Sequence, residues 1–330
     1  MTEGLIDFAS GTPAEGSLDV RWICGVPSRW RGREAPIQVH RYDEHTVILR
    51  QSKTVSYEAP FLFLLFGNER ALLLDTGATA DPGRFPLRAT VDALITAWLG
   101  KHPRAGYELV VAHSHGHNDH VAGDGQFAGR PATTVVARDV AAVRSFFCFG
   151  DGWPDRTVSL DLGGRVLEVL GSPGHHQAAI TVYDPWTALL FTGDTVLPGR
   201  LYVSDFTAFL ATMNRLADFA ATRPVSHVLG CHVEMTNQPG RDYPLGATYQ
   251  PDERPLQMTA AQLTAVRGAA AIVAGRPGVH RFDDFIVYNE PRRADQLKLV
   301  GRGLAHKVRA AVAPRRAARG LVAPPRAPGG

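Results

Sequence analysis

Histidines gather in three short stretches of this 330-residue chain. Seven of its thirteen histidines lie there: His113, His115, His117 and His120 in AHSHGHNDHVAG, His175 and His176 in SPGHH, and His232 in LGCHVE. Residues scattered by chance do not cluster in this way. Neutral imidazole is a common ligand of zinc and other transition metals. The three stretches therefore predict a metal site.

The first stretch carries the spacing His-x-His-x-Asp-His directly after the apolar run ELVVA. A chain leaving a strand presents alternate residues to one side, so His115 and His117 can face one ion. Asp119 and His120 follow one residue later. They can reach a second ion, displaced by the roughly 3.5–4 Å typical of two-metal sites.

Several neighbouring residues allow more than one interpretation. His113 and His176 flank the ligand positions, and a loop neighbour usually points away. Cys231 precedes His232, so a thiolate ligand and a small buried side chain are both open. Tyr202 could offer its phenol to an oxyanion, but a packed tyrosine is the commoner case. Isolated histidines are expected to be surface or hydrogen-bonded core residues: His40, His45, His102, His227, His280 and His306.

Short apolar runs broken by Gly, Pro and charged residues predict the sheets that position these stretches. HTVILR, APFLFLLFG and RALLLDTG, between residues 45 and 75, are typical of three consecutive strands. Residues 91–99 carry apolar side chains at the spacing of a helix buried on one face, and ELVVA predicts the next strand.

The second half repeats this pattern. Further strands are predicted in TTVVA, RVLEVL, AAITVYD, TALLFTGD and SHVLG. Amphipathic helices are predicted over 206–220 and after Thr259, which is suited to cap a helix. Two sets of strands, each followed by helices, predict an α/β protein with two sheets packed face to face and helices outside.

Charge and composition exclude other classes. The chain nets +3, but its last 22 residues hold five arginines and no acid, so the preceding 308 residues net −2. A folded region with net negative charge does not favour binding to the phosphates of nucleic acid. No apolar run approaches the 18 or so residues of a spanning helix, and the first residues lack the features of a secretory signal. Three widely spaced cysteines do not suggest disulfides. We therefore expect a cytoplasmic protein with no membrane partner.

Five motifs in order make the chain resemble the metallo-β-lactamase-fold hydrolase superfamily, from about residue 45 to about 235. They are LLLDTGA with Asp75, HSHGHNDHVAG, SPGHH with His175, LLFTGDT with Asp194, and LGCH with His232. The resemblance implies a four-layer αββα sandwich with metals at one edge between the sheets. We expect one domain over 1–308, in which segments 1–44 and 236–308 pack on the core, and a disordered basic tail over 309–330.

Carried over to this sequence, the family pattern implies two divalent metal ions. The implied ligands are His115, His117 and His175 for the first ion, Asp119, His120 and His232 for the second, and Asp194 as a bridge. Asp119 and Asp194 are the predicted catalytic carboxylates. Asp75 is expected to orient the ligand loop from outside the ligand set, with a strand-end turn residue as the alternative. Zinc is the expected metal, with iron and manganese as alternatives.

An aspartate at the bridging position matches the pattern of glyoxalase II-like and lactonase-like members. The zinc β-lactamases have Cys or Ser at this position, so the chain resembles them less. We expect a binuclear hydrolase that attacks a small ester, thioester or lactone with a metal-bridging hydroxide. The alternative is a mononuclear iron sulfur dioxygenase-like oxidoreductase, which His120 and His232 disfavour. A nuclease is less favoured. The nuclease branch that carries an additional inserted domain has no room for it, since 19 positions separate His175 from Asp194 and 38 separate Asp194 from His232. The net negative charge of the folded part disfavours other nucleases. The expected partner is a small-molecule substrate. Residues 250–308 offer one or two helices and few lysines, so glutathione recognition is not indicated.

Overall fold

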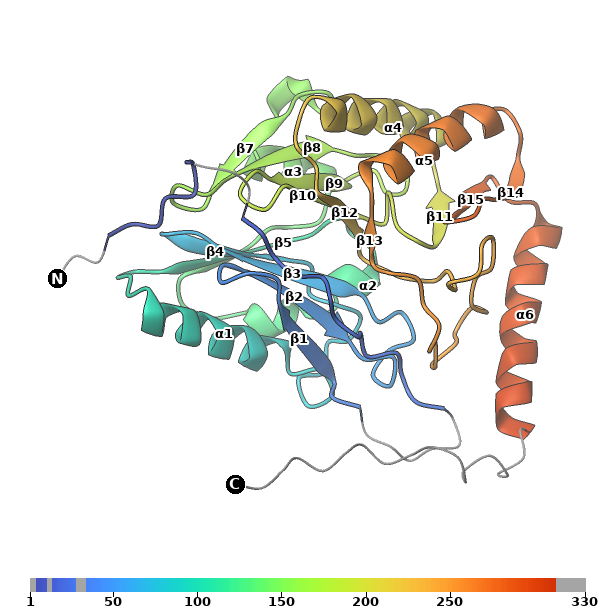
Figure 1. Ribbon diagram of the computed structural model, residues 1–330, viewed down its shortest axis with the longest axis horizontal. Coiled ribbons are helices and arrows are strands. Elements are labelled where there is room, and N and C mark those ends of the chain that lie inside the picture. The colour runs from blue at the N-terminus through green and yellow to red at the C-terminus, as the bar shows by residue number, and fades with distance from the viewer. Residues whose placement is uncertain (1–3, 11–13, 28–33, 313–330) are drawn as a thin grey trace.

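The first of two large sheets holds most of the N-terminal half (Figure 1). The computed structural model describes residues 4–10, 14–27 and 34–312. The strands lie in chain order: β1 Ile37–Arg41, β2 Thr46–Gln51, β3 Phe61–Phe66, β4 Arg70–Leu74, β5 Glu108–Ala112 and β6 Thr133–Val135. β1 to β4 pair antiparallel, and β4, β5 and β6 are parallel. Parallel neighbours need a crossover, which helix α1 (Leu87–Lys101) supplies between β4 and β5.

The second sheet has the order β13-β12-β10-β9-β8-β7. Its strands are β7 Val158–Asp161, β8 Val166–Gly171, β9 Ile180–Asp184, β10 Leu189–Gly193, β12 His227–Gly230 and β13 Gln257–Met258. β10 and β12 are parallel, and helix α4 (Phe206–Ala221) lies between them in the chain. Each sheet thus contains an antiparallel meander of four strands followed by a parallel crossover, and in the second sheet β13 then pairs antiparallel with β12.

The main core lies between the sheets, and strand β3 shows why its sequence FLFLLF is apolar throughout. Successive side chains of a strand point to opposite faces. Phe63 belongs to the cluster between the sheets, where its ring lies 4.6 Å from that of Phe191 on β10. Leu64 belongs to the outer cluster under α1, with Trp98. Both faces of β3 are therefore buried, which removes the usual alternation of apolar and polar residues.

Helices cover the outer face of each sheet (Figure 1). α1 covers the first sheet, and α4 with α5 (Ala260–Val273) covers the second. Asp205 caps α4 by accepting from the Ala208 N–H. Thr259 and Gln262 form a reciprocal capping box at the start of α5. The result is a four-layer αββα sandwich.

Smaller elements surround the sandwich. They are α2 Asn118–Val121, α3 Val140–Phe146, the 3₁₀ helices Asp124–Phe127 and Gly150–Gly152, a third sheet of β11 Arg200–Val203, β15 Ile286–Asn289 and β14 Gly278–Arg281, and helix α6 Arg293–Val312. Strand β11 pairs in parallel with β15, which lies far away in the sequence. None of the described helices combines the length and apolar character that crossing a bilayer requires.

The predicted strands, the helices at 91–99 and 206–220, the Thr259-capped helix and the packing of two sheets between helices are confirmed. The third sheet was not predicted, because its strands are short and pair over a long sequence distance. Helix α6 runs to Val312, so residues 309–312 of the predicted tail are helical. The rest of that tail, residues 313–330, lies outside the described residues.

Candidate metal centre

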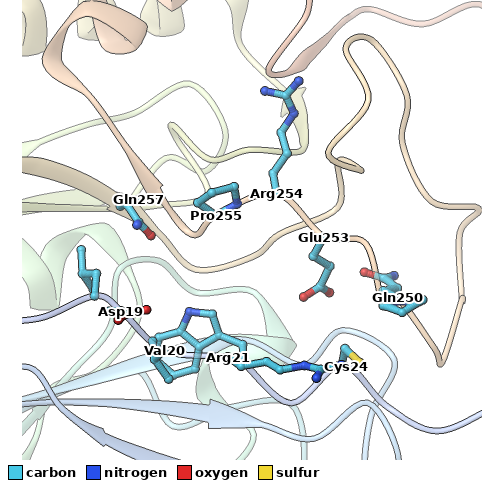
Figure 2. Close-up of a pocket in the computed structure, with 12 residues that line it drawn as sticks. Asp19, Val20, Arg21, Cys24, Gln250, Glu253, Arg254, Pro255 and Gln257 are labelled. Atoms are coloured by element: carbon cyan, nitrogen blue, oxygen red, sulfur yellow. The ribbon is translucent and has the colours of Figure 1, made fainter. Parts of the chain in front are cut away.

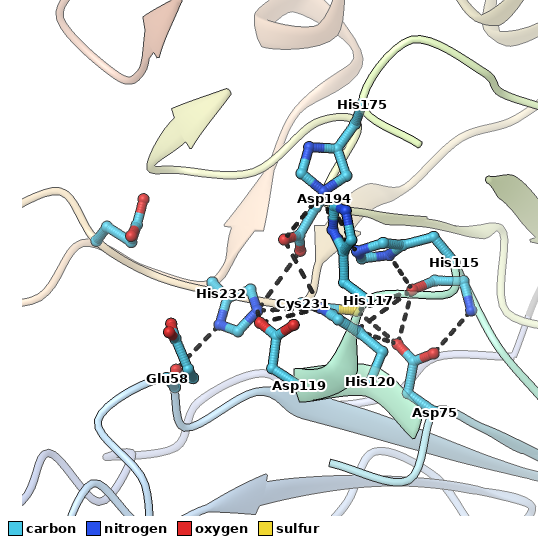
Figure 3. A network of polar contacts seen from close by, with 12 residues as sticks. Glu58, Asp75, His115, His117, Asp119, His120, His175, Asp194, Cys231 and His232 are labelled. Carbon is cyan, nitrogen blue, oxygen red and sulfur yellow. Dashed lines mark hydrogen bonds and ion pairs between the residues drawn. The ribbon is translucent and has the colours of Figure 1, made fainter. Parts of the chain in front are cut away.

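The predicted site residues follow the carboxyl ends of five strands. Asp75 follows β4, the stretch 113–120 follows β5, His175 lies four residues after β8, and Asp194 and His232 follow β10 and β12. β4 is parallel to β5, and β10 is parallel to β12, so each pair ends at a common edge. Figure 3 shows the side chains from these ends meeting in one cluster.

The three-histidine group consists of His115, His117 and His175. His115 Nε2 lies 3.0 Å from His117 Nδ1, and His175 Nε2 lies 2.9 Å from His117 Nδ1 and 3.2 Å from His115 Nε2. Three mutually adjacent ring nitrogens cannot all satisfy one another, because a neutral imidazole has one donor and one acceptor. This arrangement is suited to hold one cation.

The carboxylate group consists of Asp119, His120, Asp194 and His232. His232 Nε2 lies 3.4 Å from Asp119 Oδ2, 3.6 Å from Asp194 Oδ1 and 3.3 Å from His120 Nε2. Ligand atoms from these four residues all lie within 4.8 Å of one another. Two nitrogens and two carboxylates are a donor set that zinc, iron and manganese accept.

Asp194 lies between the two groups. Its Oδ2 is 3.7 Å from His120 Nε2 and 3.8 Å from His175 Nε2. Its Oδ1 is buried and has no hydrogen-bond partner. A buried carboxylate oxygen without a partner is costly unless a cation or donor approaches it. The residues present therefore fit divalent cations, with Asp194 able to reach both positions.

The outer nitrogen of three of these histidines is fixed by a further contact. His175 Nδ1 lies 2.7 Å from the Tyr202 carbonyl, and His232 Nδ1 lies 3.0 Å from the Glu58 carbonyl. His115 Nδ1 lies 3.1 Å from Ser114 Oγ. Such contacts select the tautomer and aim the other nitrogen at the centre. Sequence reasoning missed Ser114 and Glu58; only Ser114 lies inside a recognised stretch, and any residue could offer the Glu58 carbonyl.

Asp75 lies just outside the carboxylate group and organises it. Its carboxylate accepts from the Ser114 N–H at 2.7 Å and the Ser114 hydroxyl at 2.8 Å, and lies 2.9 Å from His120 Nδ1. The Cys231 thiol donates to it at 3.1 Å. Asp75 adopts the left-handed conformation with φ +70°, which is uncommon outside glycine. These contacts are those of a residue that orients the ligand loop.

Burial and local charge shift the pKa values of His117 and His232, one from each group, in opposite directions. Burial, together with the neighbouring His175 and His176, lowers the pKa of His117 to about 4. Burial also favours neutral His232, but Asp194 and Asp119 outweigh it and raise the His232 pKa to about 9. His117 thus offers a free nitrogen at neutral pH, whereas His232 keeps a proton that a bound cation would displace.

None of the ambiguous residues belongs to the three-histidine group or the carboxylate group. His113 Nε2 lies 2.8 Å from Asp124, and His176 Nδ1 accepts from the Ala178 N–H. The Tyr202 hydroxyl accepts from Arg200 Nε at 2.9 Å. Cys231 is fully buried, and burial raises the pKa of its thiol well above the usual range.

None of the six isolated histidines belongs to either group. His45 and His102 do lie within 4.8 Å of Glu44. The Trp98 N–H donates to His45 Nδ1 at 3.1 Å, and Glu44 pairs with Lys101 at 3.3 Å.

A separate pocket of about 280 Å³ lies between the N-terminal segment 18–24 and the loop 250–257 (Figure 2). Glu253 lines it and pairs with Arg50 at 2.7 Å and with Lys53 at 3.6 Å. None of the predicted site residues lines this pocket.

Comparison with known proteins identifies the class of this fold and site. The sequence profile of the metallo-beta-lactamase superfamily matches residues 59–232, more than half of the chain. The chain belongs to the metallo-beta-lactamase superfamily, and its αββα sandwich is the fold of that family.

Individual relatives of known name share about a third or less of their residues with this chain. A hydroxyacylglutathione hydrolase of Pseudomonas entomophila is 32% identical over 162 residues, 44% of this chain and 55% of the relative. One of Synechococcus sp. (strain JA-3-3Ab) is 27% identical over 243 residues, 70% of this chain and 85% of the relative. The match thus spans about half of the first relative's length and most of the second's.

Solved structures of similar proteins include two metallo-beta-lactamases. That of Pontibacter korlensis has a TM-score of 0.44 and 21% identity, covering 59% of this chain and 91% of its own. That of Hirschia baltica has a TM-score of 0.44 and 16% identity, covering 60% and 90%.

Proposed function

We propose that this protein is a binuclear metal-dependent hydrolase that cleaves a small thioester, ester or lactone. The observation that carries the proposal is the position of Asp194, whose carboxylate reaches both the three-histidine group and the carboxylate group while one of its oxygens is buried without a hydrogen-bond partner. Membership of the superfamily supports metal-dependent hydrolysis. The relatives named hydroxyacylglutathione hydrolase favour a thioester among the three substrates.

The residues of the chain prepare the site before any substrate arrives. His115, His117 and His175 hold one position, and Asp119, His120 and His232 hold the other. Two divalent ions, when bound, lower the pKa of a water between them so that hydroxide forms near neutrality. Asp75 fixes the direction of His120, and the carbonyls of Tyr202 and Glu58 fix His175 and His232. Preorganised ligands avoid reorganisation during the reaction.

Measurement of metal content tests this proposal. The adjacent residues His175 and His176 supply the test variant and its matched control. Elemental mass spectrometry should find two divalent ions per chain. Asp194→Ala and His175→Ala should each lose metal and lower kcat/KM by more than about 100-fold, beyond what loss of an orienting residue costs. His176→Ala should retain both metals, since its ring lies outside both groups. Full metal retention in Asp194→Ala would contradict the bridging assignment, and a single iron with oxygen uptake would favour the dioxygenase.

A substrate panel tests the bond that is cleaved. It compares a hydroxyacyl thioester of glutathione, the same acyl group on a small thiol, the matching oxygen ester, and a lactone. We expect the highest kcat/KM for a thioester. Equal rates on the glutathione and small-thiol esters would agree with the few lysines of residues 250–308. No hydrolysis of any member by the metal-loaded protein would refute the proposal.

A further inference from the structure

The outer face of helix α6 exposes four large apolar side chains. Leu297 is 72% exposed, Val300 48%, Leu304 59% and Val308 62%. Their spacing of three and four residues places them on one face, here called the α6 stripe. Other large exposed apolar residues on the described surface are scattered among separate elements. Figure 1 shows α6 at the edge of the molecule, beside the loop that precedes β13.

The inner face of α6 is already held by the fold. Leu299 packs on the cluster of Met235, Ile286 and Tyr288. Arg302 pairs with the buried Asp242 at 3.0 Å. At Gly303, a Cβ would lie 2.7 Å from the Leu245 carbonyl, so the backbones of helix and loop are in close contact. The helix therefore has a defined orientation, and the α6 stripe faces outward.

Positive charge surrounds the stripe. α6 holds five basic residues and one acidic residue, a net +4. The following residues 313–330 add four arginines and no acid, so the last 38 residues net +8 in a chain of +3, and the 292 before them net −5. At 100° per residue, Lys298 and Arg309 lie on one flank of the stripe and Lys307 on the other. All three are exposed.

We propose that the outer face of α6 docks on a lipid bilayer that carries anionic headgroups. The helix lies parallel to the surface, with the α6 stripe among the upper acyl carbons and Lys298, Lys307 and Arg309 at the lipid phosphates. An apolar stripe flanked by basic residues on a helix of low mean hydropathy is the pattern of interfacial helices. Basic residues near an anionic surface strengthen such binding.

Other occupants fit less well. A second copy of the chain would bring two helices of net +4 together, and their like charges would repel. Nucleic acid phosphates would use the basic residues but leave the α6 stripe in water. The sequence excluded a membrane partner because no apolar run could span a bilayer, and a helix that lies on the surface needs no such run.

Vesicle co-sedimentation of the whole chain tests the proposal. Vesicles of phosphatidylcholine with phosphatidylglycerol should bind the protein, and vesicles of phosphatidylcholine alone should bind it far more weakly. The double substitution Leu297→Ser and Leu304→Ser should weaken binding at least about tenfold, since each leucine loses part of its burial in lipid. The pair Lys298→Glu and Arg309→Glu should weaken it similarly.

Ile272→Ser is the matched control, because Ile272 is also 62% exposed but lies on α5. It should bind vesicles like the unchanged chain. Melting temperature and hydrolysis should be unchanged in all variants, so loss of binding cannot be attributed to unfolding. Absence of binding to anionic vesicles would overturn the proposal. Unchanged vesicle binding by the Leu297→Ser, Leu304→Ser double variant would also overturn it. So would a dimer in light scattering that this double variant abolishes without any change in lipid binding.

Discussion

Two buried clusters of charged side chains lie at opposite edges of the sandwich and are built in opposite ways. The metal centre lies where β4, β5, β10 and β12 end. At the other edge, just before β8 begins, Arg165 pairs with Asp184. Its remaining N–H groups donate to the carbonyls of His45 and Phe66 and to the hydroxyl of Thr46. Arg165 thus ties the second sheet to β2 and β3 of the first.

The difference lies in how completely each cluster is satisfied. Every nitrogen of the Arg165 guanidinium donates to an oxygen, and both oxygens of Asp184 accept. In the metal centre, Asp194 Oδ1 lacks a hydrogen-bond partner, and ring nitrogens face one another at 2.9–3.3 Å. A cluster that supports only the fold pairs its polar groups, because unpaired ones are costly. The cluster with unsatisfied polar groups is the one suited to bind cations.

Arg165→Met is the change expected to have the largest effect on stability. It leaves Asp184 buried and charged without its main partner, so the free energy of unfolding should fall by about 3–5 kcal/mol. Urea unfolding measures this loss. The metal content of the folded fraction should not change, because Arg165 lies at the far edge.

Adding Asp184→Asn to Arg165→Met should recover part of the lost stability, since the uncompensated charge is removed. A loss below about 1 kcal/mol in the single variant, or a parallel loss of metal, would contradict the separation of the two edges.

Lys53 provides an intermediate case, a buried cation that shares its acid. It lies 3.6 Å from Glu253, which also binds Arg50, and burial lowers the Lys53 pKa to about 8. Between pH 8 and its ordinary value of 10.5, the unfolded chain binds more protons at Lys53 than the folded chain. The free energy of unfolding should therefore rise with pH across this window, by up to about 3 kcal/mol from this group.

The Lys53→Met variant lacks this titration. Urea unfolding at both ends of the window should give a smaller rise for the variant than for the unchanged chain, and subtraction removes the titration of other groups. Identical rises in the two proteins would show that Lys53 keeps an ordinary pKa in the fold.

The sequence predicts the metal centre far better than the Arg165 cluster, and the reason is chemical. A metal site restricts residue types to His and Asp and places them just after strands, so local spacing reveals them. Arg165 instead binds carbonyls of His45 and Phe66, which any residue could supply. Asp184 is one of many acidic residues, and nothing near it marks the partner.

Most strands of the fold can be predicted for the same reason, because their signal is local. Apolar runs predict nine of the twelve strands in the two large sheets, since each run depends only on local burial. The edge strands β1, β7 and β13 were not predicted. The third sheet depends on pairing β11 with β15, whose residues 200–203 and 286–289 are far apart in the chain. No local pattern contains that information. The roles of the seven site residues as ligands stay predictions until metals are measured.

Asp75→Asn tests the boundary between the two kinds of cluster with the smallest expected effect. Asp75 is well satisfied, like Asp184, yet it contacts a predicted ligand through His120 Nδ1. Asparagine keeps one acceptor but can present an amide N–H to His120, which favours the wrong tautomer. Metal affinity should fall by 10- to 100-fold, about 1.4–2.8 kcal/mol. Competition with a metal chelator measures it.

Asp124→Asn is the matched control for Asp75→Asn. Asp124 lies 2.8 Å from His113, so the two form a second His–Asp pair of nearly the same length as the pair of Asp75 and His120. Asp124 follows His120 by four residues in the chain and also accepts from Thr76. Because His113 is outside both ligand groups, this change should alter stability and leave metal affinity within about threefold, since coupling between separate sites is small. Equal loss of metal in both variants would mean that general loosening of the loop, rather than the orientation of His120, controls the affinity.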